Sequence, residues 1–261
     1  MGIKFIEQSY ADIDSIASVV VSTGSTLKDR MRDRRFSTKW ASSGSDDTTV
    51  ETIEIDFGTM RDIDYIQLLN FNWKQYTIKY DVLGVPTDFS TTISKTTESE
   101  LNSKIYNNFT LVNTQKIYIT ITKTITADQE KYLGELILSN VLGTLNGYPS
   151  IKPMISKSKI TKKMLRGKSK IVDKDEVIGY SLNFKTYPDA DDLTLMESLW
   201  DRRTPFHVLI SGGDESIFTN IRRGYRNRDI RLVAVSKEYS PTYYKNLYFS
   251  GVDFSFELVE V

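Results

Sequence analysis

Residues Thr38–Tyr80 read TKWASSGSDDTTVETIEIDFGTMRDIDYIQLLNFNWKQYTIKY, and this stretch decides the fold that we expect. Apolar and polar side chains alternate between Val50 and Phe57, which is the period of two of a strand with one buried face. We expect Gly58 to end that strand. A more continuous apolar run follows over Ile63–Leu69, and Tyr76–Tyr80 alternates again. Three strands separated by turn residues predict an antiparallel β-sandwich.

The order of short segments in the first half of the chain is typical of one family. The segments are LKD, TKWAS, IEIDFG, IDYIQLLN and YTIKY, followed by YLGELIL at Tyr132–Leu138. This order resembles the discoidin, or galactose-binding-like, domain, in which T-x-W-x-S precedes an I-x-(I/V)-D-(L/F)-G strand and a strand containing glutamate closes the domain. The resemblance covers residues 20–140 and implies a jelly-roll sandwich that binds carbohydrate. The family often carries a disulfide that ties the domain ends, and this chain has no cysteine to form one.

Composition excludes several classes of site. The 261 residues include 34 basic and 34 acidic side chains and no cysteine. Disulfides and thiolate metal sites are therefore excluded, and the net charge indicates neither a nucleic-acid nor a membrane partner. The first 150 residues hold 15 basic and 19 acidic side chains, and the rest hold 19 and 15. This asymmetry suggests complementarity between neighbouring subunits.

We expect neither a signal peptide nor a membrane-spanning segment in this sequence. The opening residues MGIKFIEQSY lack the apolar core of a signal peptide, and no run of about 18 apolar residues occurs. We therefore expect a soluble chain without a membrane partner.

Turn residues divide the chain into two domains. Gly143, Pro149 and Pro153 lie in the strongest cluster of turn-forming residues. We predict a galactose-binding-like sandwich over residues 1–142, a linker over 143–153 and a second domain over 154–261.

The second domain is predicted to be a β-barrel or sandwich with one flanking helix, and the chain as a whole to be mainly β. The helix is expected at about residues 189–203, since Leu193, Met196, Leu199 and Trp200 recur at helical spacing before Pro205. Strand patterns surround it, including SLNFKT, PFHVLISGG and FSFELVEV. At the level of this pattern, the domain resembles the tail-tube and distal-tail-ring barrels of tailed bacteriophages. That resemblance implies assembly into a ring around a channel.

The sequence contains few residues typical of catalytic sites. We expect that the chain is not an enzyme and binds no metal or cofactor. The single histidine, His207, has apolar neighbours and is expected to be structural. Gly167-Lys168-Ser169 mimics the end of a phosphate-binding loop, but Lys162 occupies the position of the required upstream glycine.

A glycan site would need aromatic and polar side chains on loops at one end of the sandwich. The candidates are Trp73, Phe71, Arg34, Arg35 and Asp46. Aromatic residues near loops also serve as packing or interface anchors, so a role in the core stays open for the first two.

Two basic segments predict an interface. The candidate residues are Lys162, Lys163, Arg166, Arg222, Arg223, Tyr225, Arg226 and Arg228. We favour contact with neighbouring subunits over contact with DNA that passes through a channel.

The leading hypothesis is a structural virion component of a tailed bacteriophage, made in the host cytoplasm. Its partners would be copies of itself in a ring, neighbouring tail proteins and a host-surface glycan. The alternative is a carbohydrate-binding module for host-surface attachment, and a third hypothesis is an accessory domain pair of a glycan-active enzyme.

Overall fold

The computed structural model describes most of the chain as two compact units. The described residues are 2–12, 17–33, 38–44, 46–95, 103–146, 150–156, 159–163, 169–173, 177–186, 190–202, 205–209, 230–235, 242–245 and 250–260. The sandwich unit comprises Ile6–Val141, and the C-terminal unit comprises Met1–Phe5, Leu142–Gly212 and Ile230–Val261. Among the described residues the chain is mainly β with antiparallel sheets, as predicted.

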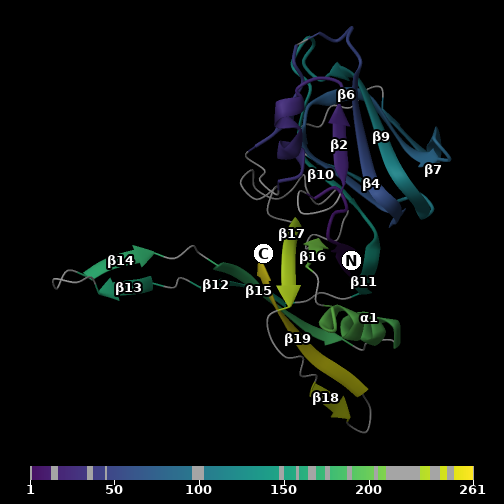
Figure 1. The fold of residues 1–261 in the computed structure, drawn as a ribbon. Helices are drawn as coiled ribbons and strands as arrows, with labels where there is room; N and C mark the ends of the chain where they lie inside the picture. The colour runs from purple at the N-terminus through teal and green to yellow at the C-terminus, as the bar shows by residue number, and fades with distance from the viewer. Residues whose placement is uncertain are drawn as a thin grey trace. The chain divides into compact units, whose positions relative to one another are not determined.

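The sandwich unit consists of two sheets (Figure 1). The first has the order β2-β4-β9-β6-β7, with bounds Ser18–Val21, Glu51–Ile63, Val112–Thr124, Trp73–Val82 and Val85–Lys95. The second has the order β3-β10-β5-β8, with bounds Trp40–Ala41, Tyr132–Ser139, Tyr65–Phe71 and Ser103–Tyr106. A short 3-10 helix, η1 (Ser25–Met31), follows β2.

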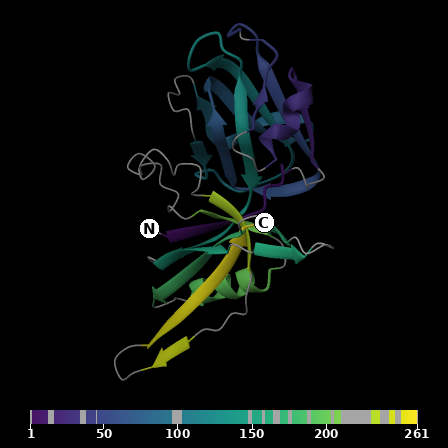
Figure 2. The ribbon, with the colours of Figure 1, turned by 90° about the vertical axis from the view of Figure 1, so that its left-hand side faces the viewer.

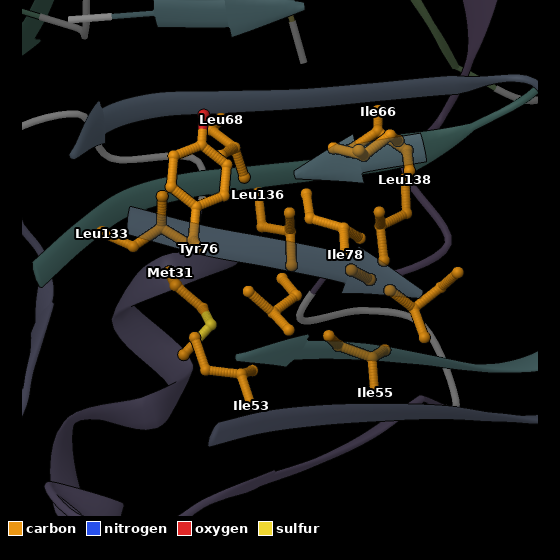
Figure 3. Packing of buried hydrophobic residues seen from close by; sticks show 14 of the residues in the cluster. Met31, Ile53, Ile55, Ile66, Leu68, Tyr76, Ile78, Leu133, Leu136 and Leu138 are labelled. Carbon is orange, nitrogen blue, oxygen red and sulfur yellow. The ribbon is translucent and has the colours of Figure 1, made fainter. Parts of the chain in front are cut away.

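The core of the sandwich unit lies between these sheets (Figure 3). Alternation in β4 buries Ile53 and Ile55, and the more continuous apolar run of β5 buries Leu68. Leu136 of β10 and Met31 of η1 complete this part of the cluster. Each fully buried aliphatic side chain contributes about 1.5–3 kcal/mol, so burial of the alternating residues favours packing of the two sheets.

The strand predicted to end at Gly58 continues to Ile63. Its register with β9 shifts between Asp56 and Arg61, and Gly58 has φ 70. The Asp56 carboxylate accepts a 2.8 Å hydrogen bond from the Gly58 N–H. A β-bulge with glycine in the left-handed region therefore carries the strand through a position that resembled a terminus.

Among its described residues, the C-terminal unit contains a larger sheet and helix α1 (Figure 2). Its described strands run in the order β11-β1-β16-β17-β19-β15-β12, with β18 paired to β19. Their bounds are Val141–Asn146, Gly2–Glu7, Phe206–Leu209, Ile230–Val235, Ser250–Glu260, Val177–Thr186, Ser150–Ser156 and, for β18, Thr242–Lys245. β13 (Lys159–Lys163) and β14 (Ser169–Asp173) pair separately. Helix α1 (Ala190–Trp200) occupies the segment predicted to be helical and buries Met196 and Leu199.

The predicted linker over 143–153 contains parts of two strands, β11 and β12. Pro153 is compatible with a strand because β12 is outermost in the described order, and proline within sheets is found on edge strands. Gly143 leaves room for Leu195, whose Cδ2 atom lies 2.5 Å from where a Cβ would stand. The N-terminal strand β1 also belongs to this sheet, so Met1–Phe5 are part of the C-terminal unit and not of the predicted first domain.

Candidate functional site: the loop end of the sandwich

Three loops of the sandwich unit gather at one end of its sheets. The register pairs Val21 with Ile53 and Glu51 with Ile121, so β2 ends where β4 begins and β9 approaches its end. Residues 22–25, 42–50 and 125–131 therefore leave the sheets on the same side, and we call them the loop end. The chain enters and leaves the unit at the opposite side, where the Glu7 N–H donates a 2.9 Å hydrogen bond to the Asn140 carbonyl.

A buried lysine holds the longest of these loops. The side chain of Lys131 is 1% exposed, and its Nζ donates to the carbonyls of Asp46 at 2.9 Å and Thr49 at 3.0 Å. The main chain of Lys131 pairs with Ser42, which donates its N–H to the Lys131 carbonyl and accepts the Lys131 N–H at its hydroxyl. The buried ammonium group of Lys131 thus holds loop 42–50 in place by hydrogen bonds to two of its carbonyls.

Asp47 links loop 42–50 to the end of β9. Its carboxylate accepts hydrogen bonds from the Thr124 N–H at 3.0 Å and the Thr124 hydroxyl at 2.8 Å. The Asp47 N–H donates to the Asp128 carboxylate at 3.2 Å. Burial raises the pKa of the Asp47 carboxyl, and the hydrogen bonds that this carboxylate accepts lower it. The lowering is the larger effect in sum, so the pKa lies below its ordinary value.

Asn72 holds both ends of loop 125–131 by hydrogen bonds. This side chain is buried; it donates to the Glu130 carbonyl at 2.8 Å and accepts the Tyr132 N–H at 2.9 Å. Its own carbonyl accepts the Ile125 N–H at 2.8 Å. Three bonds from one residue therefore join both ends of the loop to the turn between β5 and β6.

The buried carboxylate of Glu51 ties loop 22–25 to the same end. It accepts hydrogen bonds from the Ser22 and Thr23 hydroxyls. The Trp40 indole donates to the Thr23 carbonyl at 3.2 Å, and the Gly24 N–H donates to the Ser43 hydroxyl at 3.2 Å. All three loops are consequently held by hydrogen bonds that cross from one loop or strand to another.

The surface of the loop end is polar and rich in carboxylates. Its exposed residues include Ser43, Asp46, Thr48, Thr126, Asp128, Gln129 and Glu130. Hydrogen bonds from the Thr48 hydroxyl and N–H hold the pKa of the Asp46 carboxyl below its ordinary value. Each oxygen of an ionised carboxylate can accept a further bond, so Asp46 remains able to bind a donor from a ligand.

The ring of Tyr132, next to these loops, is partly covered. It is half-buried at the start of β10, and the Lys39 ammonium lies 3.7 Å from its ring centroid. This cation–π contact occupies one face of the ring.

Of the five residues predicted for a glycan site, the structure describes Trp73, Phe71 and Asp46. Trp73 and Phe71 are both 0% exposed and pack on each other with ring centroids 5.7 Å apart, so these rings cannot stack on a ligand from solvent. Asp46 is exposed at the loop end. Arg34 and Arg35 lie outside the described residues.

The predicted interface falls largely outside the described residues. Lys162 and Lys163 lie in β13. The others, Arg166, Arg222, Arg223, Tyr225, Arg226 and Arg228, are not among the described residues.

The residues that build the loop end were not predicted from the sequence. Lys131 precedes the closing strand in QEKYLGELIL, where a lysine is usually solvated. Asn72 and Thr124 are polar residues next to turns and carry no pattern of their own. No local signal distinguishes them, because the partners described above are 53 to 89 residues away along the chain.

Metal-binding and membrane-spanning features are absent from the part of the chain that the structure describes. Within those ranges, no group of three or more His, Cys, Asp or Glu side chains could hold a metal ion. No described helix is long and apolar enough to cross a membrane. His207 is buried in β16.

Comparisons with known proteins find likeness in solved structures. No protein-family model and no curated protein matches the chain. Chitosan-binding module 1 of a chitosanase/glucanase from Paenibacillus sp. IK-5 is 19% identical, and the match covers 51% of this chain and 100% of the module with a TM-score of 0.43. Module 2 of that enzyme, in complex with chitotriose, is 21% identical over 50% of this chain and 99% of the module, with a TM-score of 0.41.

A third similar structure is the module CBM32-3 of a family 31 glycoside hydrolase from Clostridium perfringens. It is 17% identical over 48% of this chain and 90% of the module, with a TM-score of 0.40. The two packed sheets predicted for the first half are present in the sandwich unit, and its resemblance to galactose-binding-like domains stays a prediction. The resemblance of the second half to phage tail rings stays a prediction.

Proposed function

We propose that this chain is a non-catalytic carbohydrate-binding protein whose sandwich unit binds a glycan at the loop end. The observation that supports it is a set of exposed polar groups on loops that buried hydrogen bonds hold in place, above all those from Lys131 to Asp46 and Thr49. A sugar is recognised by donors and acceptors at set positions. Loops that are already ordered lose little conformational entropy when they bind it.

The chemistry of these groups suits hydroxyl-rich ligands. The exposed carboxylates of Asp46, Asp128 and Glu130 accept hydrogen bonds, and the Gln129 amide both donates and accepts. Hydrogen bonds to charged acceptors contribute about 1.5–3 kcal/mol. With a few such contacts, we expect the Kd for a glycan to lie in the micromolar to millimolar range.

The test is a glycan array followed by calorimetric titration of each glycan that binds. We expect saturable binding by the full chain and a loss of about tenfold in affinity for Asp46→Asn, which retains the acceptor for the Thr48 N–H. Asp88→Asn is the matched control, because Asp88 is an exposed carboxylate on β7 that pairs with Lys79. Equal affinity of Asp46→Asn and Asp88→Asn, or no glycan bound, would contradict the proposal.

Ring assembly on a phage tail stays a prediction for the C-terminal unit. The open sides of β11 and β12, which are outermost in the described order, are backbone edges that copies of the chain could cover. Light scattering and negative-stain microscopy of the full chain check this, since a ring gives a large, uniform particle and an isolated chain does not.

A further inference from the structure

The strand pair β13–β14 lies in the most basic stretch of the chain. Residues 151–172 contain eight basic side chains and no acidic one, although the whole chain has no net charge. The eight are Lys152, Lys157, Lys159, Lys162, Lys163, Arg166, Lys168 and Lys170. Such a local excess of charge attracts an anionic partner and is independent of the loop end in the other unit.

The register of this pair places like charges opposite each other. Lys162 is the Cα partner of Lys170, whereas Lys159 is the partner of Asp173. Like charges at opposed positions destabilise a sheet. A negative charge beside this ribbon would reduce the repulsion between Lys162 and Lys170.

The residue types distinguish between possible anionic partners. Lysine is depleted from protein–protein interfaces, which favour aromatic anchors, and residues 151–172 contain no aromatic residue. The same absence disfavours single strands, whose bases stack on aromatic rings. A two-stranded β-ribbon fits the major groove of B-form DNA, where lysines can neutralise phosphates on both sides.

We propose that the β13–β14 ribbon binds duplex DNA through backbone phosphates and without preference for sequence. Lys159, Lys162, Lys163 and Lys170 lie on its two described strands and carry the contact.

The experiment measures fluorescence anisotropy of a labelled 20-bp duplex with the full chain at several salt concentrations. We expect micromolar binding at 50 mM salt that weakens steeply by 200 mM, because each neutralised phosphate releases counterions. The double variant Lys162→Thr/Lys170→Thr replaces the like-charge pair with a favourable Thr–Thr pair. It should therefore keep or raise the stability of the ribbon while its affinity falls about tenfold and its salt slope becomes shallower by about two.

The matched control removes two exposed lysines from the sandwich unit. Lys74→Thr/Lys123→Thr changes the net charge equally, and we expect less than a twofold change in affinity. The proposal is overturned by no saturable binding at 50 mM salt, or by equal losses in the two double variants. It is also overturned by tighter binding of heparin or of a 20-nucleotide single strand than of the duplex. A change of oligomeric mass in Lys162→Thr/Lys170→Thr without DNA would assign these lysines to a second copy instead.

Discussion

The ammonium group of Lys131 donates a 2.9 Å hydrogen bond to the main-chain carbonyl of Asp46, 85 residues earlier in the chain. With the second bond to Thr49, it closes loop 42–50 from inside. Lys131→Met preserves length and removes both bonds. We expect the free energy of unfolding to fall by about 1–3 kcal/mol, measured by urea denaturation, and any glycan affinity to fall with loop order. Unchanged stability together with unchanged amide exchange in residues 46–49 would contradict this role.

Low pH should reduce the free energy of unfolding of the sandwich unit, because it protonates hydrogen-bonded carboxylates. The pKa values of Asp46, Asp47 and Asp56 all lie below the ordinary value of 3.8. A carboxyl group whose pKa is lower in the folded state stabilises the fold at pH values above its pKa in the unfolded state. This stabilisation is lost as the pH falls through its pKa in the folded state. We therefore expect a constant urea midpoint from pH 7 to about 5 and a fall below about pH 4. Asp47→Asn should make that fall smaller, and an equally steep fall in the variant would argue against Asp47.

Gly24 is needed for the contact between loop 22–25 and β3. It has φ 66, and a Cβ at this position would lie 2.0 Å from the Ala41 carbonyl oxygen. Because the clash is with main chain and the conformation is left-handed, Gly24→Ala cannot relax cheaply. We expect a loss of at least about 2 kcal/mol, measured by thermal unfolding. Gly44→Ala is the comparison, since its φ is also positive but nothing lies within 4 Å of the place that its Cβ would take. Equal losses in the two variants would show that the Ala41 contact does not matter.

Leu83 occupies a turn position that suits asparagine better. It is 98% exposed with φ 52, and Gly84 follows with φ 86 in the hairpin between β6 and β7. Two residues with positive φ favour Asn-Gly. Leu83→Asn should therefore raise the free energy of unfolding by about 0.5–1 kcal/mol, visible as a higher Tm. A loss of stability would show that Leu83 is covered by another part of the protein.

Trp73 should behave as a core residue when it is mutated. It lies 5.6 Å from Tyr76 and 5.7 Å from Phe71 between ring centroids, and all three are buried. Trp73→Ala should cost about 3–5 kcal/mol by removing a large buried side chain. Loss of glycan binding in this variant would follow from unfolding, so circular dichroism must accompany it. A folded variant of wild-type stability would contradict the buried position.

Local patterns determined the strands and the helix of this protein. Alternation around Ile53 and Ile55 predicted β4, and the spacing of Met196 and Leu199 predicted α1, because these periods reflect which face of an element is buried. The bulge at Gly58 was not predicted, since a glycine with a following polar residue has the same local signature at a strand end and within a bulge.

The candidate site depended on contacts between residues far apart in sequence. Asp46 was predicted to lie on a loop, but nothing near it in sequence indicated that Lys131 would reach it. Trp73 was a candidate for the glycan site with a role in the core left open, and only the packing of Phe71 and Tyr76 around it shows that it is buried.

By itself, the sequence determined that the chain is mainly β, that one helix lies near residue 195, and that Cys-based chemistry is absent. Tertiary structure alone decided that β1 joins the sheet of the C-terminal unit and that Lys131, Asn72 and Glu51 hold the loop end together. The physical reason is that periodicity is a property of neighbouring residues. Strand partners and buried hydrogen bonds form only after distant segments have been brought into register.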